Sequence, residues 1–552
     1  MTSQSQVRRI NAELAKDGAA PRMVSASTVV TSALPALILA TLCLLPYLNK
    51  AFLIDDPEYL TMARQIVKHP MHPMDFDICW NTIESCTKLY LLTPGNSLMG
   101  YVLVPTVLAG AHEWMAHLTQ LVLVWIAVVA MISLIFRLGW DRWHATAGAL
   151  LLVALPPFLS MASTAMPDIL ATAIALVAME RLAAWKVEQK WSQGLASAIA
   201  LGLAGFARPH LVLLLPLAAF FLMKSLDLRE VMEQIRTRFW LWIPVLGGGC
   251  LLLAMILAVR EHNLALSPPS VVTGVQHIQA NLYAFLLYFA FPLPLAACWV
   301  ANTLNARRLL LVSILSLITI VPWLLRYSHS FVPFLVVFGG GAIADLLFRA
   351  LKEREHTDLF LMLWILIPLP IVYYSHLPMK YLLPCVPAVI FLCFRLLDDV
   401  SVQFARTAAF VVIVASTGYS LLILHADAEF ANFARGALNS LINPHVAKGE
   451  RVWFGGQYWS YWYAPLAGAK LTFEGGPQPE PGDLFVVDVF AAEGHSPAKR
   501  FPHRTLIETI PHKYRFGRTM GAGVGLYSNG SGYWLWGFGE TEEDRFELWR
   551  ID

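Results

Sequence analysis

Two adjacent carboxylates, Asp55 and Asp56, follow the first long apolar stretch of the chain, in LIDDPEYLTMARQI. Carboxylates are costly near hydrocarbon, so a pair at such a boundary needs a reason. Asp56 precedes Pro57 and has the form of a helix N-cap, with proline at the first helical position. One helix end needs only one such cap. Asp55 is therefore left to accept a proton from a hydroxyl nucleophile or to bind a cation, with a solvated loop acid as the alternative.

A second candidate acid is Asp168, in STAMPDILATA, where it follows Pro167 and precedes another apolar stretch. By itself, an acid in this position is explained by its favourable interaction with the N-terminal end of a helix dipole. Two acids that reach the same membrane face from separate segments favour a functional site. We therefore expect Asp168 and Asp55 to share a face.

Three cations stand at ends of apolar stretches that are expected to face outward: Arg208 in FARPHL, Arg326 in LLRYSHSF and Lys380 in PMKYLLP. Such residues can bind an anionic headgroup, for example the phosphate of a lipid-linked substrate, through charge-assisted hydrogen bonds. The alternative is snorkelling to ordinary phospholipid. His329 shares the segment of Arg326. Because the histidine spacing forms no HExxH or similar motif, a zinc enzyme is disfavoured.

The composition shows what kind of elements position these residues. The chain has 552 residues, of which 57% are hydrophobic and only 14% are charged, and its mean hydropathy is +0.56. These values exclude an ordinary soluble protein and indicate an integral membrane protein in contact with lipid. The net charge of +2 is spread without a basic face or tail, so we expect no nucleic-acid partner.

Apolar stretches long enough for helical crossings recur along the chain, each crossing needing about 20 residues. They predict an α-helical polytopic protein with about 13 transmembrane helices. The predicted stretches are 28–48, 116–137, 144–160, 169–185, 192–206, 210–224, 239–260, 281–301, 308–325, 330–348, 358–374, 381–396 and 406–424.

The distribution of Lys and Arg predicts the orientation, because basic residues precede the first apolar stretch and recur in alternate loops. Residues 1–27 are expected to form a cytoplasmic tail and residues 28–424 the transmembrane domain. The first outer loop is then 49–115, and the segment 425–552 lies on the same outer side. The first apolar stretch lacks a small-residue cleavage site after it and is expected to be a retained anchor.

Two cysteines, Cys79 and Cys86, lie in the predicted outer loop. In an oxidising compartment they could form a disulfide. Spacing alone does not establish the geometry, so two unpaired thiols remain the alternative.

The segment 425–552 differs from the rest by its polar and aromatic composition and by turn signals such as PQPEPGD and SNGSG between short runs. This pattern predicts a small extracytoplasmic domain of α/β or mostly β structure. It shows no triad and no metal cluster, so no chemistry is assigned to it. Asn529 begins a match to the glycosylation acceptor pattern, which is weak at three residues.

These motifs resemble the GT-C superfamily of membrane glycosyltransferases, and within it the branch of protein O-mannosyltransferases and lipid A aminoarabinose transferases. The branch has a pair of acids in its first outer loop with tyrosine four residues after the first acid, and Asp55, Asp56 and Tyr59 occupy those places. Asp168 matches a second acid of the branch. The stretches GLAGFARPHLVLLLP and MKYLLPCVPAVIFL are similar to its later spans, so the resemblance covers residues 28–424.

Two departures concern acceptor binding. TPGNSLMGYVL stands where many relatives have a proline-proline-leucine stretch, and Arg208 stands where lysine is frequent. The acceptor is therefore left open by the resemblance.

The resemblance implies an inverting transfer of a hexosyl or pentosyl group from a polyprenyl-phosphate donor to a glycan, lipid or protein acceptor. The expected location is the outer face of a bacterial inner membrane, with the C-terminal domain periplasmic or extracellular. Asp55 is then the general base or acceptor-orienting acid, and Asp168 positions the acceptor or a cation. Cationic groups stabilise the departing phosphate, on which negative charge grows. The expected substrate-binding residues are Asp56, Tyr59, Arg208, Arg326, His329 and Lys380. A divalent cation beside Asp55 and Asp168 is left open.

Two other functions fit a membrane protein of this composition: a transporter or flippase for a lipid-linked substrate, and a non-catalytic assembly protein. Transporters place acids and bases near the middle of the membrane and often contain inverted repeats. Here the charges stand at the ends of apolar stretches and no internal repeat is apparent, which favours the enzyme.

Overall fold

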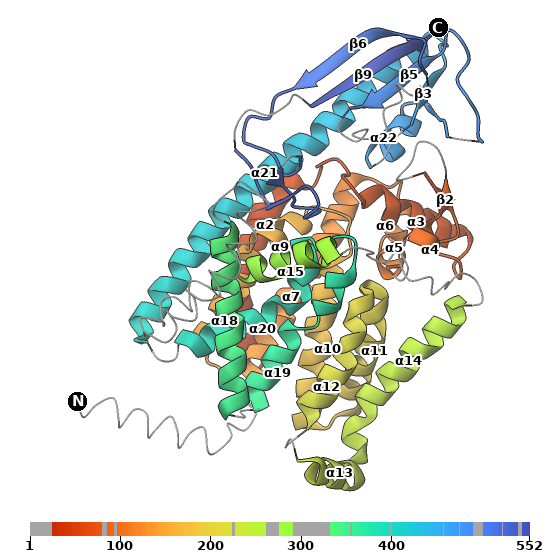
Figure 1. Cartoon of the computed structure of the whole chain (residues 1–552). Helices are drawn as coiled ribbons and strands as arrows, with labels where there is room; N and C mark the ends of the chain where they lie inside the picture. Colours follow the sequence, from red (N-terminus) through yellow and green to blue (C-terminus); the bar gives the residue numbers. More distant parts are fainter. Residues whose placement is uncertain are drawn as a thin grey trace.

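The structure is a computed structural model. It describes residues 25–79, 86–92, 96–223, 227–260, 275–290, 332–353, 356–397, 400–455, 458–473, 475–489, 501–521, 523–538 and 544–552. Most of these residues are helical. Figure 1 shows a helical body with a small sheet domain at the end where the C-terminus lies.

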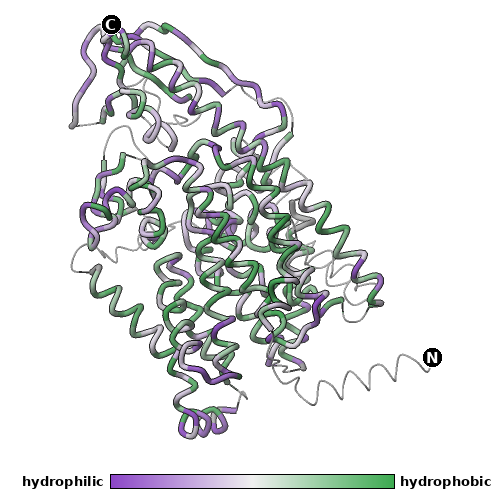
Figure 2. Tube along the Cα trace, turned by 180° about the vertical axis from the view of Figure 1, so that it is seen from behind, coloured by the Kyte–Doolittle hydropathy of each residue, from purple (hydrophilic) through white to green (hydrophobic). Residues whose placement is uncertain are grey.

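Helices long and apolar enough to cross a membrane make up much of the body. Among the described residues six helical stretches meet this description: Ala26–Tyr47, Glu113–Arg137, Phe239–Ala258, His356–Tyr373, Met379–Leu397 and Val402–Ala447. The protein is thus a multi-pass membrane protein, as the composition predicts. Figure 2 shows that the helices of the body are mostly hydrophobic.

The first half of the chain contains the following elements: α2 (Ala26–Leu44), η1 (Leu45–Tyr47), α3 (Asp56–Lys68), β1 (Asp77–Ile78), β2 (Thr87–Lys88), α4 (Leu89–Leu92), α5 (Leu98–Val102), α6 (Val104–Leu108), α7 (Glu113–Arg137), α8 (Arg142–Ala154), α9 (Pro156–Met161), α10 (Asp168–Glu188), α11 (Trp191–Ala207), η2 (Pro209–Leu213), α12 (Leu214–Leu222), α13 (Leu228–Thr237), η3 (Phe239–Trp242) and α14 (Ile243–Arg260).

The second half contains α15 (Val275–Ala290), α18 (Val332–Glu353), α19 (His356–Ile365), η4 (Leu369–Tyr373), η5 (Met379–Cys385), α20 (Val386–Leu397), α21 (Val402–Ala447), β3 (Val452–Phe454), α22 (Ser460–Leu466), β4 (Lys470–Leu471), β5 (Leu484–Asp488), β6 (Arg504–His512), β7 (Gly523–Val524), β8 (Gly532–Trp534) and β9 (Asp544–Ile551).

The predicted stretch 144–160 is divided into α8 and α9. Leu155, between them, has an extended backbone (φ −64°, ψ 130°). The proline that follows it disfavours a helical conformation at Leu155, so the helix stops and a short new one begins at Pro156. The predicted stretch 308–325 lies outside the described residues, as does the second half of 281–301.

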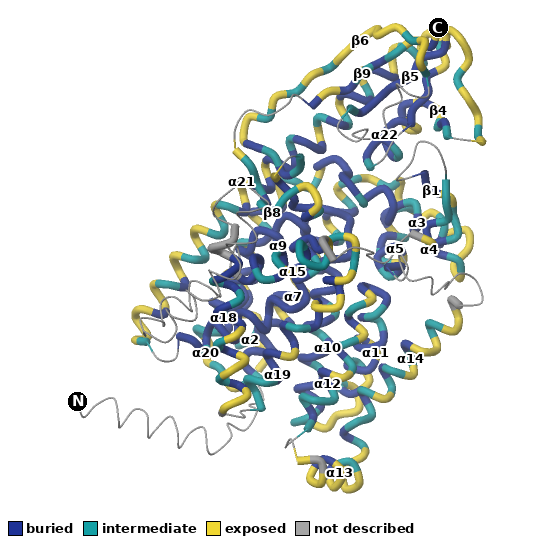
Figure 3. The backbone as a smooth tube through the Cα atoms, viewed as in Figure 1, coloured by how far each residue is buried: buried dark blue, intermediate teal, exposed yellow. Residues whose placement is uncertain are grey.

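The centre of the body is built on α10, which packs against α7 and α11. Six of its 21 residues are alanine, and Ala171, Ala173, Ala175 and Ala178 are buried. Small side chains let helices approach closely, which is the usual way to pack helices in a membrane. Figure 3 shows α7, α9 and α10 among the most buried segments.

The predicted outer loop 49–115 folds as α3 to α6 with the short strands β1 and β2. Asp77 pairs with Lys88 and Ile78 with Thr87, antiparallel. Cys79 and Cys86, which flank the connection between these strands, are joined in a disulfide.

The long helix α21 links the body to the sheet domain. The sequence predicts a domain boundary at residue 425, but the helix continues to Ala447. Beyond 425, buried residues still recur at helical spacing: Ala431, Ala434, Leu438 and Leu441. The change in composition therefore marks where the helix becomes polar on its exposed side and not where it ends.

The C-terminal domain holds a five-stranded mixed sheet in the order β4-β3-β5-β9-β6. Strand β3 runs parallel to β4 and β5, whereas β9 runs antiparallel to β5 and β6. Helix α21 packs against this sheet and also against α8 and α9 of the body. The sheet and α22 lie at the same end of the molecule as α3 (Figure 1).

Candidate active site

The carboxylate of Asp55 forms an ion pair with Lys380. The Lys380 Nζ atom lies 3.1 Å from Asp55 Oδ2, and the Asp55 side chain is 30% exposed whereas that of Lys380 is 2% exposed. Asp55 occupies the N-cap position of α3, but its side chain makes no capping hydrogen bond. The Asp55 carboxylate therefore does not cap the helix, and it is accessible to solvent beside a buried cation.

Asp56 has a different role from the predicted N-cap. It is the first residue of α3 and is fully buried. Its Oδ2 accepts from the Leu53 N–H at 2.9 Å, and its Oδ1 accepts from the Ala165 N–H at 2.7 Å. The cap prediction was wrong because the carboxylate satisfies donors outside the helix. Asp56 therefore ties the segment before α3 to the turn between α9 and α10.

Burial changes the protonation of Asp56, which lies outside the six spanning stretches. Burial raises its pKa to about 7, against the lowering effect of Lys50 and of the two backbone hydrogen bonds. The group is therefore close to half protonated at neutral pH, and a proton would break neither hydrogen bond to the backbone if it sits on an unused lone pair.

A second buried ion pair joins Asp168 and Arg208. The Arg208 Nη2 atom donates to Asp168 Oδ1 at 2.6 Å, with side-chain exposures of 7% and 1%. Asp168 is the first residue of α10, as the sequence predicts. Arg208 is extended (φ −152°, ψ 128°) because Pro209 follows it, so α11 ends at Ala207 and presents the arginine at the helix end.

The aromatic ring of Tyr381 lies beside both cations. The Arg208 Cζ atom is 4.5 Å from the ring centroid and Lys380 Nζ is 5.8 Å from it. Cation–π attraction of this kind is strongest where water is excluded. Tyr381 therefore connects the Asp55–Lys380 pair with the Asp168–Arg208 pair.

Tyr59, one turn after Asp55 in α3, is buried among the same charges. Burial raises its pKa; Arg208 acts in the opposite direction, while Glu58, Asp55 and Asp168 raise it further. The structure thus brings together Asp55, Tyr59, Asp168, Arg208 and Lys380, and we call these five residues the acid–base cluster. Of the other predicted site residues, Asp56 adjoins the cluster through the backbone, whereas Arg326 and His329 lie outside the described residues.

Two polar atoms of the cluster lack a hydrogen-bond partner among the described residues. They are Asp168 Oδ2 and Arg208 Nε. Buried polar groups are nearly always satisfied in proteins. An unsatisfied acceptor and an unsatisfied donor within one ion pair are suited to a polar ligand that supplies both partners.

His376 also lies next to the cluster. Its ring centroid is 6.0 Å from that of Tyr381. Burial, and then the charge of Lys380, lower the pKa of His376 to about 4. A neutral imidazole is therefore expected there at neutral pH.

A divalent cation does not fit the cluster as its residues lie. Both candidate carboxylates already face cations, Asp55 facing Lys380 and Asp168 facing Arg208. Within the described part of the chain, no group of three or more His, Cys, Asp and Glu side chains is placed to hold a metal ion.

A second charged group, missed by sequence reasoning, lies under the C-terminal domain. Lys50 forms a fully buried ion pair with Asp427 of α21. The Asp427 carboxylate also accepts from Tyr527 Oη at 2.7 Å and Thr519 Oγ1 at 3.0 Å. Lys50 is 377 residues from Asp427 in the sequence, so no local pattern could have paired them.

The C-terminal domain also contacts the body through Asn529. Its Oδ1 accepts from the Leu377 N–H at 2.7 Å, and its Nδ2 donates to Asn281 Oδ1 at 2.8 Å. Asn529 is 7% exposed. The weak match to the glycosylation acceptor pattern therefore falls on a residue that is buried and engaged in the interface.

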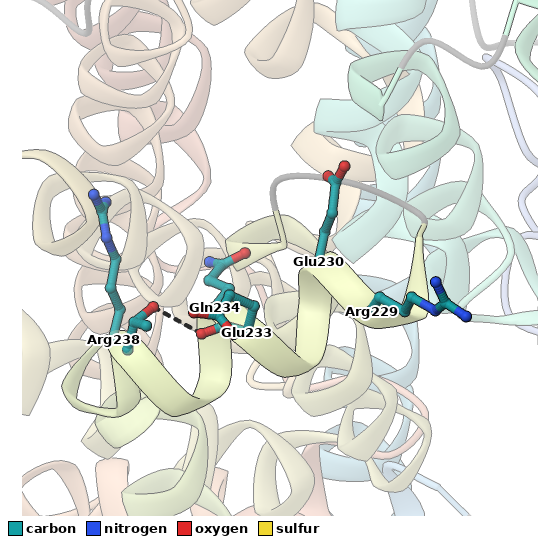
Figure 4. A pocket seen from close by; sticks show the side chains of 6 residues that line it. Arg229, Glu230, Glu233, Gln234 and Arg238 are labelled. Carbon is teal, nitrogen blue, oxygen red and sulfur yellow. Dashed lines mark hydrogen bonds between the residues drawn. The ribbon is translucent and has the colours of Figure 1, made fainter.

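A surface pocket occurs elsewhere, along α13. Figure 4 shows Arg229, Glu230, Glu233, Gln234 and Arg238 around it. These residues belong to α13 and its C-cap, Arg238, at the end of the molecule opposite the sheet domain (Figure 1). The pocket is separate from the acid–base cluster.

No family model and no curated protein matches the chain. Solved structures do match. The apo structure of ArnT from Cupriavidus metallidurans is 14% identical over 81% of this chain and 86% of its own, with a TM-score of 0.49. ArnT from the same organism bound to undecaprenyl phosphate is 15% identical over 89% and 97%, with a TM-score of 0.42.

The Archaeoglobus fulgidus oligosaccharyltransferase tethered with an acceptor peptide is 13% identical over 80% of this chain and 64% of its own, with a TM-score of 0.43.

Proposed function

We propose that this chain is an integral membrane glycosyltransferase that transfers a sugar, with inversion, from a polyprenyl-phosphate donor to an acceptor at the outer face of the membrane. The observation that carries the proposal is the Asp55–Lys380 ion pair, in which an accessible carboxylate lies beside a buried ammonium group. Such a pair supplies a base for a hydroxyl and a cation for a phosphate at one place.

The proposed reaction begins with an acceptor hydroxyl that loses its proton to Asp55. The acceptor oxygen attacks the anomeric carbon of the donor, and the bond from that carbon to the phosphate oxygen breaks. The bonding electrons remain on the phosphate, where negative charge grows. Lys380 and Arg208 stabilise this charge, because both are cations with buried side chains.

A donor phosphate that binds Lys380 competes with Asp55 for the ammonium group. Donor binding therefore releases the Asp55 carboxylate to bind the acceptor hydroxyl.

The two acids have separate roles in this mechanism because their exposures differ. Asp55 is 30% exposed and can be reached by an acceptor, whereas Asp168 is 1% exposed and paired with Arg208. Asp168 therefore holds the Arg208 guanidinium in place. The unsatisfied Arg208 Nε remains available for a donor oxygen.

The first test measures donor binding with undecaprenyl phosphate as the probe, on the full chain in lipid nanodiscs. Lys380→Met and Arg208→Met should each weaken binding by about tenfold or more, since a charge-assisted hydrogen bond contributes roughly 1.5–3 kcal/mol. Lys88→Met is the matched control. Lys88 also pairs with a carboxylate, that of Asp75 in the outer loop 49–115, but it is 38% exposed. Equal binding by all variants would remove the phosphate role.

The second test measures sugar transfer, by mass spectrometry of outer-surface lipids and secreted proteins from cells with each variant. Asp55→Asn should abolish transfer while undecaprenyl phosphate still binds, since the amide cannot act as a base. Asp75→Asn is the control for a carboxylate of the same loop, 41% exposed. Unchanged transfer by Asp55→Asn would overturn the assignment of the base.

A further inference from the structure

The segment from Lys50 to Leu53, which leads to Asp55, is held by side chains and not by secondary structure. The Ala51 N–H donates to Asn432 Oδ1 at 3.0 Å, and the Phe52 N–H donates to Tyr463 Oη at 2.7 Å. The Leu53 N–H donates to Asp56, as described above. Three consecutive backbone donors thus have side-chain acceptors, two of them more than 370 residues away in the sequence.

The two distant acceptors are themselves fixed by a ring of polar contacts. Tyr463 Oη donates to Glu113 Oε1 at 3.0 Å, and Arg435 Nη1 lies 2.9 Å from the same oxygen. Arg435 Nη2 donates to Asn432 Oδ1 at 3.1 Å. The Tyr463 hydroxyl donates its proton to Glu113, so its oxygen is oriented to accept from the Phe52 N–H.

The residue at the head of the segment is anchored in the same way. Lys50 Nζ pairs with Asp427 and donates to the Ser163 carbonyl at 3.2 Å. Asp427 accepts in turn from Thr519 and Tyr527 of the C-terminal domain. The segment is therefore fixed at its start, along its backbone and at its end.

The backbone needs this support because Ile54 has a φ of 49°. The left-handed region is unfavourable for a β-branched residue. A conformation of this kind persists only where its surroundings impose it. Asp55 is the next residue. If the backbone of Ile54 relaxed, the Asp55 carboxylate would therefore move away from Lys380.

We propose that α21 and the C-terminal domain position Asp55 through Asn432 and Tyr463, which clamp the strained segment before it. This inference rests on the proposed function, in which Asp55 is the base, and gives the C-terminal domain a defined role in it. Asn432 and Tyr463 are positioning residues: they do not touch substrate, and they act through the backbone of residues 51 and 52.

The clamp is tested first without any activity, by hydrogen exchange of the amides of Ala51 and Phe52 in the full chain. Asn432→Leu and Tyr463→Phe each remove an acceptor and should speed exchange of the amide concerned by about tenfold or more, since protection reflects the local opening free energy. Tyr461→Phe is the matched control. Tyr461 lies on α22 like Tyr463, but its hydroxyl accepts from the Cys79 N–H at 3.3 Å and not from the segment before Asp55. Unchanged exchange in both clamp variants would overturn the proposal.

The second readout separates positioning from folding. Asn432→Leu and Tyr463→Phe should lower kcat by about tenfold to a hundredfold, because small displacements of a reacting group are costly. Binding of undecaprenyl phosphate should change little, as Lys380 and Arg208 are untouched. Asn432→Asp keeps an oxygen acceptor for the Ala51 N–H and should restore most of the rate. A loss of phosphate binding that parallels the loss of rate would show a folding defect and contradict positioning.

The two proposals fail in distinguishable ways. If the unaltered chain transfers no sugar and Asp55→Asn changes nothing, the glycosyltransferase proposal fails while hydrogen exchange still reports on the clamp. If sugar transfer depends on Asp55 but Asn432→Leu and Tyr463→Phe show the hydrogen exchange and kcat of the unaltered chain, only the positioning role of Asn432 and Tyr463 is wrong.

Discussion

The buried carboxylate of Asp56 makes the stability of the folded chain depend on pH. Its pKa is about 7 when folded against an ordinary value of 3.8, so the folded state binds the proton more tightly than the unfolded state. The stabilisation by this proton is full below about pH 4 and is lost as the pH rises through about 7. The difference corresponds to about 4 kcal/mol at most.

Asp56→Asn should remove this dependence, because the amide does not titrate. The variant also loses one of the two backbone hydrogen bonds, which lowers stability by an amount that does not change with pH. Thermal unfolding in detergent between pH 4 and pH 8 is the measurement. The gap in unfolding temperature between the unaltered chain and Asp56→Asn should narrow as the pH rises. A gap that is constant across the range would contradict a raised pKa for Asp56.

At the scale of single residues, the sequence predicts which residues stand out but not which residues they contact. Asp55, Asp168, Arg208 and Lys380 are recognisable because charged residues are rare beside apolar stretches. Their pairing depends on helix packing over long separations, so the sequence alone left each of them with an alternative explanation. Asp56 was misjudged for the same reason: one of its two donors, Ala165, is 109 residues away.

At the scale of elements, the position of Arg208 depends on the break between α11 and η2. Pro209 keeps Arg208 out of the helical region. Pro209→Ala would allow α11 to continue and the guanidinium to turn away from Asp168. We expect weaker binding of undecaprenyl phosphate, by up to about fivefold, if up to about 1 kcal/mol is lost in orienting Arg208.

Pro105→Ala is the control for this prediction. Pro105 also stands in the first turn of a helix, α6, so its replacement makes the unfolded chain comparably more flexible. The residues on either side of it in the chain, Val104 and Thr106, are not part of the acid–base cluster. If Pro105→Ala weakened phosphate binding as much as Pro209→Ala, the effect would be a general loss of stability and not a change at Arg208.

Hydropathy predicts the apolar elements well but their ends poorly. The stretch 144–160 is broken at Leu155 because a proline follows, a signal that was present in the sequence. Helix α21 runs past residue 425 because its buried side continues beyond the point where its exposed side becomes polar. Hydropathy averages both sides of a helix, and so it reports the surrounding medium more directly than the length of the helix.

At the scale of the whole molecule, Tyr527 joins the C-terminal domain to both charged groups of the body. Its hydroxyl donates to Asp427 Oδ2 at 2.7 Å, and its ring centroid lies 5.5 Å from Lys380 Nζ. The C-terminal domain could be recognised from the sequence because its composition differs from that of the rest of the chain. Its part in the site could not, because the contact joins residues about 100 to 150 positions apart across two differently folded regions.

Two substitutions at Tyr527 separate these contacts. Tyr527→Phe keeps the ring but removes a hydrogen bond to a buried carboxylate, which should lower the free energy of unfolding by about 1.5–3 kcal/mol with phosphate binding preserved. Tyr527→Leu also removes the aromatic face beside Lys380, so it should in addition change the affinity for undecaprenyl phosphate. Tyr101→Phe is the control, since its hydroxyl bonds to the Pro70 carbonyl within the first loop and crosses no domain boundary. If Tyr527→Leu and Tyr527→Phe bound the phosphate equally well, the ring would have no role beside Lys380, and the C-terminal domain would act on the site through Asp427, Asn432 and Tyr463 alone.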